Sequence, residues 1–327
     1  MYDDAFLNRL EAGLRSALPL WGLAADALLR LLTISENATF LAEAPSGDAV
    51  VLRVHRPDYH TSDEIRSELA WVDALRADGV APTPEPIRTV DGGLLGGFED
   101  DGAVRHVAAF AFMSGREPEP GDDLASWYAT LGQITARLHG HARVWGRPDG
   151  FRRKTWDFDA MLGDRPLWGD WRAGLGLDGP GRALLERTAE ALKRRVGAYG
   201  AAPERFGLIH ADLRPANLLV DGERLGLIDF DDCGFSWFMY DFAASVSFME
   251  HEPFIPELQE AWLSAYARAA PVGAEDVAMM PAFLMLRRML LTAWIASHAE
   301  TPTAQSMGVP YTHGTLALAE RYLTRHA

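Results

Sequence analysis

The sequence predicts an α+β protein with two lobes: a small N-terminal lobe with a five-stranded antiparallel sheet and one helix, and a larger, mainly helical C-terminal lobe. Two observations predict it. Strand-like runs fill the first third of the chain, whereas apolar residues at helical spacing dominate after residue 124. The chain also has 327 residues, of which 48% are apolar, and this exceeds the usual size of one hydrophobic core. A cleft between the lobes is expected to hold a substrate.

A short helix ahead of the five-stranded sheet, and then three strands of that sheet, are expected first along the chain. Residues 3–17 predict a short amphipathic helix because Phe6, Leu10 and Leu14 recur every four positions. Three apolar runs follow, and the turn-forming residues 45–48 join the last two as an antiparallel meander. These strands are expected at residues 27–34, 39–44 and 49–55.

A second helix is expected to begin at Thr61 and to end at Gly79. A hydroxyl or a carboxylate within residues 61–64 can cap it, and the acidic residues there place negative charge in its first turn, where the helix dipole favours it. Two further strands complete the lobe, one on each side of the turn at residues 91–93. They are expected at residues 85–90 and in a run that ends with residues 106–113.

The C-terminal lobe is expected to consist mainly of helices, because apolar residues recur there at helical spacing. Between its first two helices, residues 148–180 are rich in Trp, Gly and Arg and predict an irregular insertion. The tryptophans of this insertion either contact a substrate or pack the loop onto the core, and the sequence leaves both readings open. The helices are expected at residues 124–143, 181–196, 255–269, 274–299 and 315–325.

Composition excludes several classes of protein. The net charge is −15 and the sequence has no block of Lys and Arg, so neither nucleic acid nor an anionic membrane surface is an expected partner. No uncharged apolar run approaches the length of a membrane span, and the N-terminus does not resemble a signal peptide. The single cysteine, Cys233, rules out an intrachain disulfide. A cytoplasmic protein is therefore predicted.

Residues 207–232, GLIHADLRPANLLVDGERLGLIDFDD, carry the chemistry. Asp212 and Asn217 lie five residues apart after an apolar run, and Asp229 follows a second apolar run. A hairpin turn at Asp221 and Gly222 would bring Asn217 and Asp229 to the same end of a two-stranded ribbon. Such oxygen ligands suit Mg²⁺, which takes its remaining ligands from water and phosphate. Asp212 then remains to accept a proton from an attacking hydroxyl, so the segment predicts metal-assisted phosphoryl transfer.

These motifs resemble the catalytic and metal loops of the aminoglycoside phosphotransferase and choline kinase superfamily, which has a protein-kinase-like fold. HADLRPANLLVDG followed by LGLIDFDD matches the step from the catalytic aspartate to the asparagine and on to the metal-binding aspartate. Within the superfamily the chain looks most like the bacterial stress-response kinase A and homoserine kinase groups. The likeness extends from VLRVHRP through IRSELAW and LGQITARLHGHAR to LRRMLLTAWIASH.

The resemblance implies a role for each residue of the two loops. Asp212 would be the catalytic base, His210 would brace the catalytic loop, and Asn217 and Asp229 would bind Mg²⁺. Asp231 stands where classical protein kinases have glycine, and it would either reach a second Mg²⁺ or remain solvated. Asp232 would support these residues without contacting the metal or the substrate itself. Asp241 would hold the backbone amides of the catalytic loop.

In the small lobe the resemblance implies a nucleotide site for ATP. Arg53 stands where family members have a lysine that joins the phosphates to a helix glutamate, and its charge and planar fork suit phosphate. Its expected partner is Glu68, with Glu64 as second choice. The loop over the phosphates has no glycine, so donors to phosphate would come from Ser35, Asn37 and Thr39, unless this loop is a plain turn.

The resemblance also sets the lobe boundaries. Residues 1–112 would form the nucleotide-binding lobe, residues 113–118 the hinge, and residues 119–327 the helical lobe. Adenine would meet the backbone near Ala111 and Met113, within the segment 110–115.

The predicted function is an ATP- and Mg²⁺-dependent phosphotransferase that acts on a hydroxyl of a small molecule, such as an aminoglycoside, an amino alcohol or a homoserine-like compound. Two alternatives stay open. A protein Ser/Thr kinase of the stress-response type is one, although only about eleven residues separate Asp229 from Tyr240, which leaves no room for a long activation loop. A non-catalytic nucleotide-binding regulator is the other, suggested by Arg53 and by the glycine-free loop.

Overall fold

The computed structural model describes residues 4–34, 37–43, 47, 49–119 and 121–326, and the chain divides into two compact units. The division first passes between Gly115 and Arg116, inside the range expected for a hinge. The first unit comprises Met1–Gly115, Gly146–Arg153 and Gly226–Asp231, and the second comprises Arg116–Trp145, Lys154–Leu225 and Asp232–Ala327.

Two short segments return to the first unit, although the sequence placed both in the C-terminal lobe. Backbone hydrogen bonds account for this. The Leu227 amide donates to the Pro82 carbonyl at 2.9 Å, and the Arg152 amide donates to the Ser67 hydroxyl at 2.9 Å. Contacts between residues so far apart in the chain leave no pattern in the sequence.

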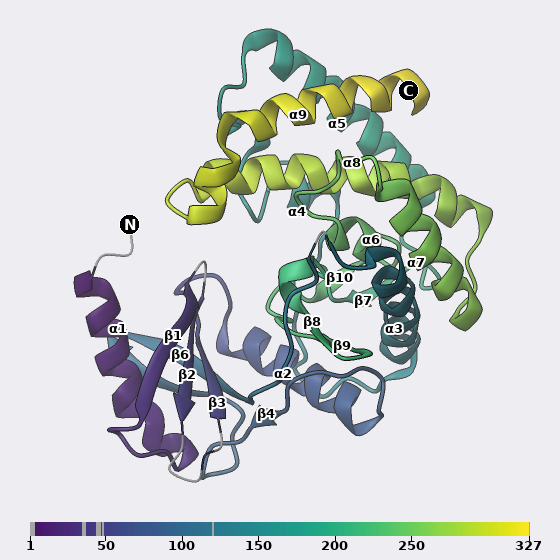
Figure 1. The fold of residues 1–327 in the computed structure, drawn as a ribbon. Coiled ribbons are helices and arrows are strands. Elements are labelled where there is room, and N and C mark those ends of the chain that lie inside the picture. Colours follow the sequence, from purple (N-terminus) through teal and green to yellow (C-terminus); the bar gives the residue numbers. More distant parts are fainter. Residues whose placement is uncertain (1–3, 35–36, 44–46, 48, 120, 327) are drawn as a thin grey trace. The chain divides into compact units, whose positions relative to one another are not determined.

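The first unit is built on an antiparallel sheet with strand order β1-β2-β3-β6-β4, in which β5 also pairs with β6 (Figure 1). The helices α1 and α2 accompany it. The strands are β1 (Leu28–Ile34), β2 (Ala38–Glu43), β3 (Ala49–Val54), β4 (Pro86–Ile87), β5 (Gly96–Asp100) and β6 (Ala103–Ala111), and the helices are α1 (Asp4–Ala17), η1 (Leu18–Trp21) and α2 (Ser62–Ala77).

The prediction of five strands was wrong: within the described residues of this unit the sheet has six. The sequence predicts one strand in the run after residue 93, whereas this run folds as the hairpin β5–β6. Asp100 pairs with Ala103, so the loop contains only Asp101 and Gly102, whose φ angles are 51° and 79°. Left-handed residues at both positions are typical of a tight hairpin turn, and the Asp-Gly dipeptide is its usual sequence.

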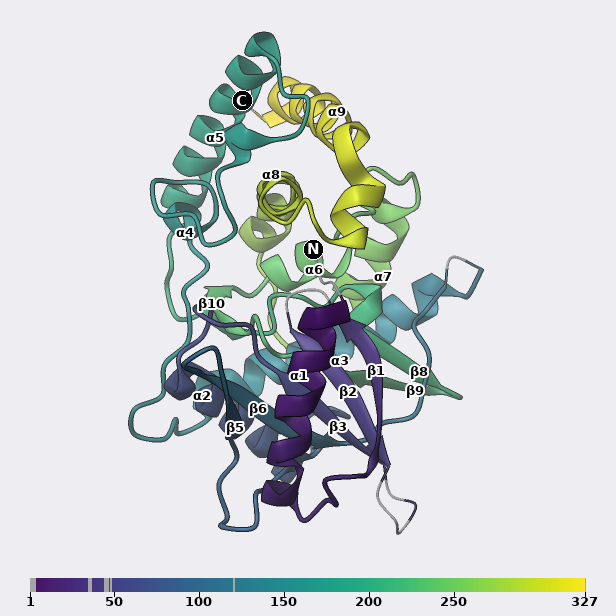
Figure 2. The same ribbon diagram turned by 90° about the vertical axis from the view of Figure 1, so that its left-hand side faces the viewer.

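The alternation of side chains along β3 gives the two faces of the sheet different neighbours. Val50, Leu52 and Val54 belong to the apolar core that also contains Leu10 and Leu14 of α1, and Figure 2 shows α1 lying across that face. Because successive side chains of a strand point to opposite faces, Arg53 points to the other face. There Ile65 and Leu69 of α2 pack on Ala108 of β6. Strand alternation thus places Arg53 beside α2.

The second unit is mainly helical, with two small strand pairs. Strand β7 pairs with β10, and β8 pairs with β9, of which only Arg224 and Leu225 belong to this unit. The elements are α3 (Leu124–Val144), α4 (Phe158–Met161), η2 (Trp171–Ala173), α5 (Gly179–Tyr199), β7 (Phe206–Ile209), η3 (Pro215–Asn217), β8 (Leu218–Asp221), β9 (Arg224–Leu227), β10 (Gly234–Trp237), α6 (Tyr240–Ser245), α7 (Ile255–Ala269), α8 (Ala274–Ser297) and α9 (Pro302–His326).

The helix α8 forms the centre of this unit. Figure 2 views it end on, with α5 and α9 beside it. Among the described residues it is the one helix whose length and composition would allow it to cross a membrane, and 83% of the stretch that qualifies is buried within the protein. A buried core helix shows the same composition. Elsewhere in the unit α3 and α7 pack closely against each other: a Cβ at Gly132 of α3 would lie 2.2 Å from the Trp262 carbonyl oxygen of α7.

The predicted helices correspond to observed ones, and the differences lie at their ends. The last helix, predicted from residue 315, already begins at Pro302. Gly308 has φ 48° and ψ −149° and produces a kink inside α9, and Pro310 follows it. Glycine and proline normally end helices, and for this reason the sequence pattern identified only the segment beyond the kink.

The tryptophans of the insertion pack into the core of the second unit. Trp156, Trp168 and Trp171 are 2%, 5% and 1% exposed. The Trp156 indole donates to the Asp232 carbonyl at 2.8 Å, and its ring meets that of Trp168 edge to face with centroids 5.1 Å apart. Of the two readings left open by the sequence, these contacts agree with packing of the loop onto the core.

Candidate functional site

In the first unit a buried arginine is held by carboxylates. Arg53 of β3 is 6% exposed, and its Nη2 lies 2.6 and 2.7 Å from the two carboxylate oxygens of Glu68 on α2. Its Nη1 lies 3.2 Å from Oδ1 of Asp229. Glu64 is engaged elsewhere, because its carboxylate accepts from the Thr61 amide at 2.8 Å and completes the capping box of α2. Of the two glutamates considered, Glu68 is therefore the partner of Arg53.

Asp229 and Asp231 differ sharply in their surroundings. Asp229 adopts a left-handed backbone conformation with φ 59°, and its side chain is 44% exposed. The side chain of Asp231 is 6% exposed, so this residue is not solvated, and its carboxylate accepts from Asn37 Nδ2 at 2.9 Å. His55 Nδ1 and His60 Nε2 approach the same carboxylate at 3.4 and 3.6 Å. A cation from solvent can reach Asp229 far more easily than Asp231.

The electrostatics of this cluster keep Asp231 ionised and His55 neutral. Burial alone would raise the pKa of Asp231, but the charge of Arg53 and the proximity of His55 and His60 hold it well below its ordinary value. Burial and the charge of Arg53 lower the pKa of His55 to about 4, against the opposing effect of Asp231. The imidazole of His55 is therefore uncharged at neutral pH.

The predicted phosphate loop is only partly described. Ser35 lies outside the described residues. Asn37 uses its amide within the protein: Nδ2 donates to Asp231, and Oδ1 accepts from the Arg56 amide at 3.0 Å. Thr39 lies in β2 directly opposite Arg53 of β3. Asn37 thus connects the end of the loop to Asp231, two residues after Asp229.

The segment predicted to meet adenine lies at the end of β6. The Ala111 amide donates to the Glu85 carbonyl at 2.8 Å, and the Phe112 amide donates to the Ala49 carbonyl at 3.1 Å. A hydrogen bond from adenine to the Ala111 backbone would therefore have to use the carbonyl. Met113 follows, half-buried, two residues before the first unit passes into the second.

In the second unit Asp212 lies in the loop that follows β7. It is 9% exposed, and its two carboxylate oxygens accept from three side chains. Asn217 Nδ2 donates to Oδ2 at 2.7 Å, Arg214 Nε donates to Oδ2 at 3.3 Å, and Arg287 Nη2 donates to Oδ1. Burial alone would raise the pKa of Asp212, but the charges of Arg287 and Arg214 and the hydrogen bond from Arg287 lower it. Asp212 is an ionised carboxylate at neutral pH.

Asn217 is oriented by the same contacts. Its Nδ2 also donates to the Asp212 carbonyl at 2.7 Å, so the amide nitrogen faces the loop and the amide oxygen points elsewhere. An oxygen donor is what Mg²⁺ prefers, and Asp229 of the first unit offers another. In the described part of the chain no three His, Cys, Asp or Glu side chains cluster closely enough to hold a metal ion. Each of the two side chains by itself offers an oxygen of the kind that Mg²⁺ binds.

Asp241 of α6 holds the loop that carries Asp212. It is fully buried, and its carboxylate accepts from the Ala211 amide at 2.7 Å and from the His210 amide at 3.2 Å. His139 of α3 approaches the same carboxylate at 2.9 Å through Nε2. His210 braces the loop as well, because its Nδ1 accepts from the Asp212 amide at 3.3 Å. These contacts fix Ala211 in a left-handed conformation with φ 66°.

Sequence reasoning missed two arginines on α8. Arg287 and Arg288 are each 2% exposed. Arg287 donates to Asp212, to the Ser247 hydroxyl at 2.8 Å and to the Ala211 carbonyl at 3.3 Å. Its guanidinium lies 5.0 Å from the centroid of the Trp168 ring. The sequence did contain a signal for them: two adjacent arginines lie within an otherwise apolar helix. Arginines on a buried helix are expected to pair with carboxylates, so this pattern indicates buried ion pairs.

Arg288 points to a different carboxylate. Its Nη1 lies 2.9 Å from Glu250 Oε2, and Nε and Nη2 donate to the Thr315 hydroxyl and the Tyr311 carbonyl. Glu250 is 8% exposed and also accepts from the Tyr311 hydroxyl at 3.2 Å. Glu250 is therefore a buried carboxylate paired with Arg288.

Comparisons with known proteins agree with this arrangement. The family model described as "Phosphotransferase enzyme family" matches residues 30–272. Amicoumacin kinase of Bacillus subtilis is 21% identical over 286 residues, which cover 82% of each protein. Homoserine kinase of Sinorhizobium medicae is 29% identical over 254 residues, covering 75% of this chain and 71% of that protein.

Solved structures show the same fold. A microcompartment-associated aminopropanol kinase has a TM-score of 0.89 and 44% sequence identity, covering 96% of this chain and 97% of the other. Amicoumacin kinase hAmiN, in complex with AMP-PNP, Ca²⁺ and Ami, has a TM-score of 0.75 at 18% identity, covering 97% and 94%. The second likeness shows the fold alone. The predicted resemblance and the protein-kinase-like α+β fold are confirmed. The chain belongs to the phosphotransferase enzyme family and is a kinase that phosphorylates hydroxyl groups of small molecules.

Proposed function

We propose that this enzyme transfers the γ-phosphoryl group of ATP, with Mg²⁺, to the hydroxyl of a short amino alcohol of the aminopropanol class. One observation carries the choice of acceptor: the aminopropanol kinase shares 44% identity with this chain over 96% of its length. The homoserine and amicoumacin kinases are less similar, at 29% and 21%. The net charge of −15 also favours a cationic acceptor over an anionic one.

Asp212 is the residue that we assign to the acceptor hydroxyl. An ionised carboxylate has about four lone-pair positions. Arg214 and Asn217 occupy Oδ2, and Arg287 takes one position on Oδ1. The remaining position on Oδ1 accepts the hydrogen bond of the hydroxyl and aims its oxygen at the phosphorus.

The lowered pKa of Asp212 suits this reaction. The transition state of phosphoryl transfer is loose, and little proton transfer is needed before the bond to phosphorus forms. Asp212 therefore acts chiefly by orienting the hydroxyl and takes up the proton late. Orientation by a fixed carboxylate removes part of the entropic barrier.

In the first unit Arg53 and Asp229 are assigned to the nucleotide. Arg53 stabilises the charge of the phosphates, and Glu68 holds its guanidinium in place through two short contacts. Asp229 and the Asn217 amide oxygen would hold Mg²⁺, which when bound neutralises charge on the phosphates. Ala111 and Met113 are assigned to adenine. We assign Asp231 no metal, since its enclosed carboxylate positions Asn37.

Steady-state kinetics with a panel of acceptors test the proposal. ADP release would be measured with 1-amino-2-propanol, ethanolamine, homoserine, choline, an aminoglycoside and a protein substrate, and ³¹P NMR would identify the phosphorylated oxygen. We expect kcat/KM to be highest for the amino alcohols by about tenfold or more, which corresponds to about 1.4 kcal/mol of differential transition-state binding.

Other outcomes of this panel overturn the proposal in different ways. A higher kcat/KM for homoserine or for the aminoglycoside would reject the amino alcohol class but keep the kinase. Label incorporated only into protein would reject a small acceptor altogether. Asp212→Ala serves as the control for contaminating kinases, because it removes the proposed base and should abolish turnover of every true acceptor.

A further inference from the structure

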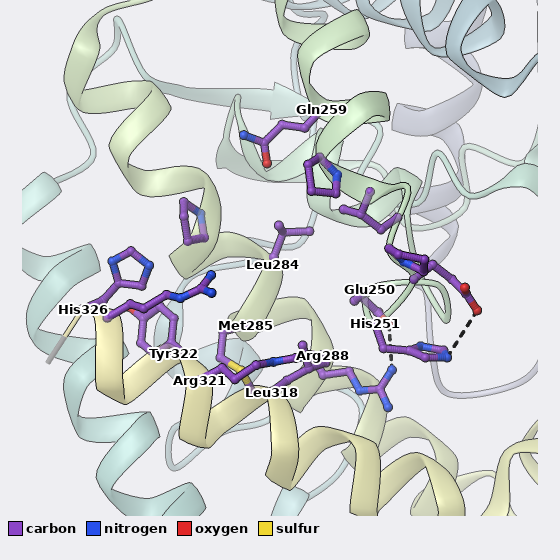
Figure 3. Close-up of a pocket in the computed structure, with 16 residues that line it drawn as sticks. Glu250, His251, Gln259, Leu284, Met285, Arg288, Leu318, Arg321, Tyr322 and His326 are labelled. Carbon is purple, nitrogen blue, oxygen red and sulfur yellow. Dashed lines mark hydrogen bonds and ion pairs between the residues drawn. The ribbon is translucent and has the colours of Figure 1, made fainter.

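A pocket of about 500 Å³ lies in the second unit between the start of α7, the first half of α8 and the last half of α9 (Figure 3). Neither Asp212 nor Arg287 lines it. Its volume lies within the range of small-molecule sites in proteins. The pocket is therefore a candidate site separate from the residues assigned to phosphoryl transfer.

Most of the lining is apolar and rigid. Leu284 and Met285 of α8 and Leu318 of α9 contribute aliphatic side chains, and Figure 3 labels all three among the lining residues. Pro253, Pro256 and Pro281 also line the pocket, and proline fixes the backbone that carries it. Such a surface favours the hydrocarbon part of a ligand.

The charges in the lining are unevenly distributed. The acidic side chains already have partners: Glu250 binds Arg288 at 2.9 Å, and Glu252 lies 3.4 Å from His251 (Figure 3). Among the described residues, no carboxylate lies within ion-pair distance of Arg321 or Arg325. The charge left over in the pocket is therefore positive, in a protein whose net charge is −15.

Helix stability does not account for these arginines. Arg321 and Arg325 are spaced four apart on α9, where like charges destabilise a helix. The helix dipole favours cations in the last turn, which contains Arg325 and His326 but not Arg321. Burial and the charges of Arg195 and Arg325 lower the pKa of His326, as expected where several cations converge. Binding of an anion would relieve this repulsion.

We propose that this pocket is a second binding site, for a small organic anion that carries a carboxylate or a phosphate group on a short hydrocarbon body. Arg321 and Arg325 pair with the anionic group, because a guanidinium offers a planar fork that matches both groups. Leu284, Met285 and Leu318 contact the hydrocarbon. The site does not depend on the proposed acceptor of the kinase reaction.

The test is a binding titration followed by NMR of methionine methyl groups in full-length protein labelled with [¹³C-methyl]methionine. The probes are hexanoate, hexyl phosphate, inorganic phosphate and hexylamine. We expect hexanoate or hexyl phosphate to shift the signal of Met285, which lines the pocket, but not that of Met161, which is buried elsewhere in the second unit. Which of the two binds more tightly identifies the anionic group.

Two double variants decide whether the arginines are responsible. Arg321→Gln with Arg325→Gln should weaken binding of the better probe about tenfold or more, since it removes two charge-assisted contacts. Arg187→Gln with Arg194→Gln removes the same charge from the exposed face of α5 and should change the affinity less than about twofold. All four positions are exposed, so both proteins should fold.

Three results would overturn the proposal. The first is no shift of the Met285 signal with either hexyl anion at millimolar concentration. The second is an equal affinity in the two double variants. The third is binding of hexylamine, or of inorganic phosphate, as tight as that of the hexyl anions, because the positive charge or the apolar lining would then contribute nothing.

Discussion

The two units hold their central charges in opposite ways. In the first, one buried cation, Arg53, faces three carboxylates, those of Glu68, Asp229 and Asp231. In the second, one buried carboxylate, Asp212, faces the two guanidiniums of Arg287 and Arg214. The first cluster has an excess of negative charge and the second an excess of positive charge.

This difference indicates what each cluster lacks. The side chain of Asp229 is 44% exposed, so a divalent cation from solvent could reach it and offset the negative charge of the first cluster. The cluster around Asp212 needs no further cation. The side chains of Arg214, Asn217 and Arg287 hold the carboxylate in place, and the charges of the two arginines keep it ionised. This difference agrees with our proposal that Asp229 helps to hold Mg²⁺ and that Asp212 orients a neutral hydroxyl.

The largest effect should come from removing the carboxylate at the centre of the second cluster. Asp212→Asn should lower kcat by about 10³-fold, within the range seen for general bases. The amide cannot accept the proton, and its NH₂ group would face cationic donors. The measurement is steady-state ADP release, with nucleotide affinity as the control, which should change little. A kcat within tenfold of the wild type would remove Asp212 from its proposed role.

The two arginines of α8 provide the next test, because they are neighbours with equal burial. Arg287→Met and Arg288→Met should each destabilise the protein by about 3–5 kcal/mol, since each leaves a buried carboxylate without its partner. Chemical denaturation measures this loss. Equal destabilisation would show that both residues support the fold to a similar degree.

Only one of these variants should change the pH dependence of the reaction. Without Arg287 the pKa of Asp212 rises, so the acid limb of the kcat profile should move to higher pH. Arg288 contacts Glu250 rather than Asp212, and its variant should keep the wild-type profile. The assignment fails if both profiles move together, or if neither moves.

The histidine beside Asp231 should make stability depend on pH. The pKa of His55 is about 4 in the folded protein and about 6.5 in the unfolded chain. Between these two pH values the unfolded chain binds a proton at His55 and the native state does not. The free energy of unfolding should therefore fall by about 3 kcal/mol as the pH decreases from about 6.5 to about 4.

His55→Asn should flatten this dependence, as measured by urea unfolding at several pH values. His251→Asn is the matched control, because the side chain of His251 is 52% exposed, and it should leave the slope unchanged. A slope in the His55 variant equal to that of the wild type would show that His55 is protonated in the native state.

The smallest effect should come from replacing Arg53, the basic residue at the centre of the first cluster, with lysine. In Arg53→Lys a single ammonium replaces the fork that now contacts both Glu68 and Asp229. Asp229 would then lose a partly exposed ion pair worth about 1 kcal/mol. The concentration of Mg²⁺ that half-saturates the reaction should fall about fivefold. An increase would mean that Arg53 helps to position Asp229 for the metal.

Local patterns predicted much of the fold and of the two loops. The spacing of Asp212, Asn217 and Asp229 depends on residues close in sequence, and helices such as Ile255–Ala269 follow from apolar periodicity alone. Six strands were observed where five were expected, because the Asp101-Gly102 turn was not recognised as a hairpin.

Contacts between distant residues could not be predicted in this way. Arg287 reaches Asp212 across 75 positions, and Asn37 reaches Asp231 across 194. Whether a polar residue is buried and paired depends on which helices meet, and no short window of sequence contains that information. For this reason the sequence left the surroundings of Asp231 open and gave no indication that Arg287 contacts Asp212.

The path of the chain constrains how this enzyme can change over generations. After Gly115 the chain returns to the first unit twice, for residues 146–153 and 226–231. No single crossover between genes can therefore exchange one complete unit for another. Exchange of a whole unit would need several crossovers at once, so point substitution is the simpler route by which the second unit can change while the first is kept.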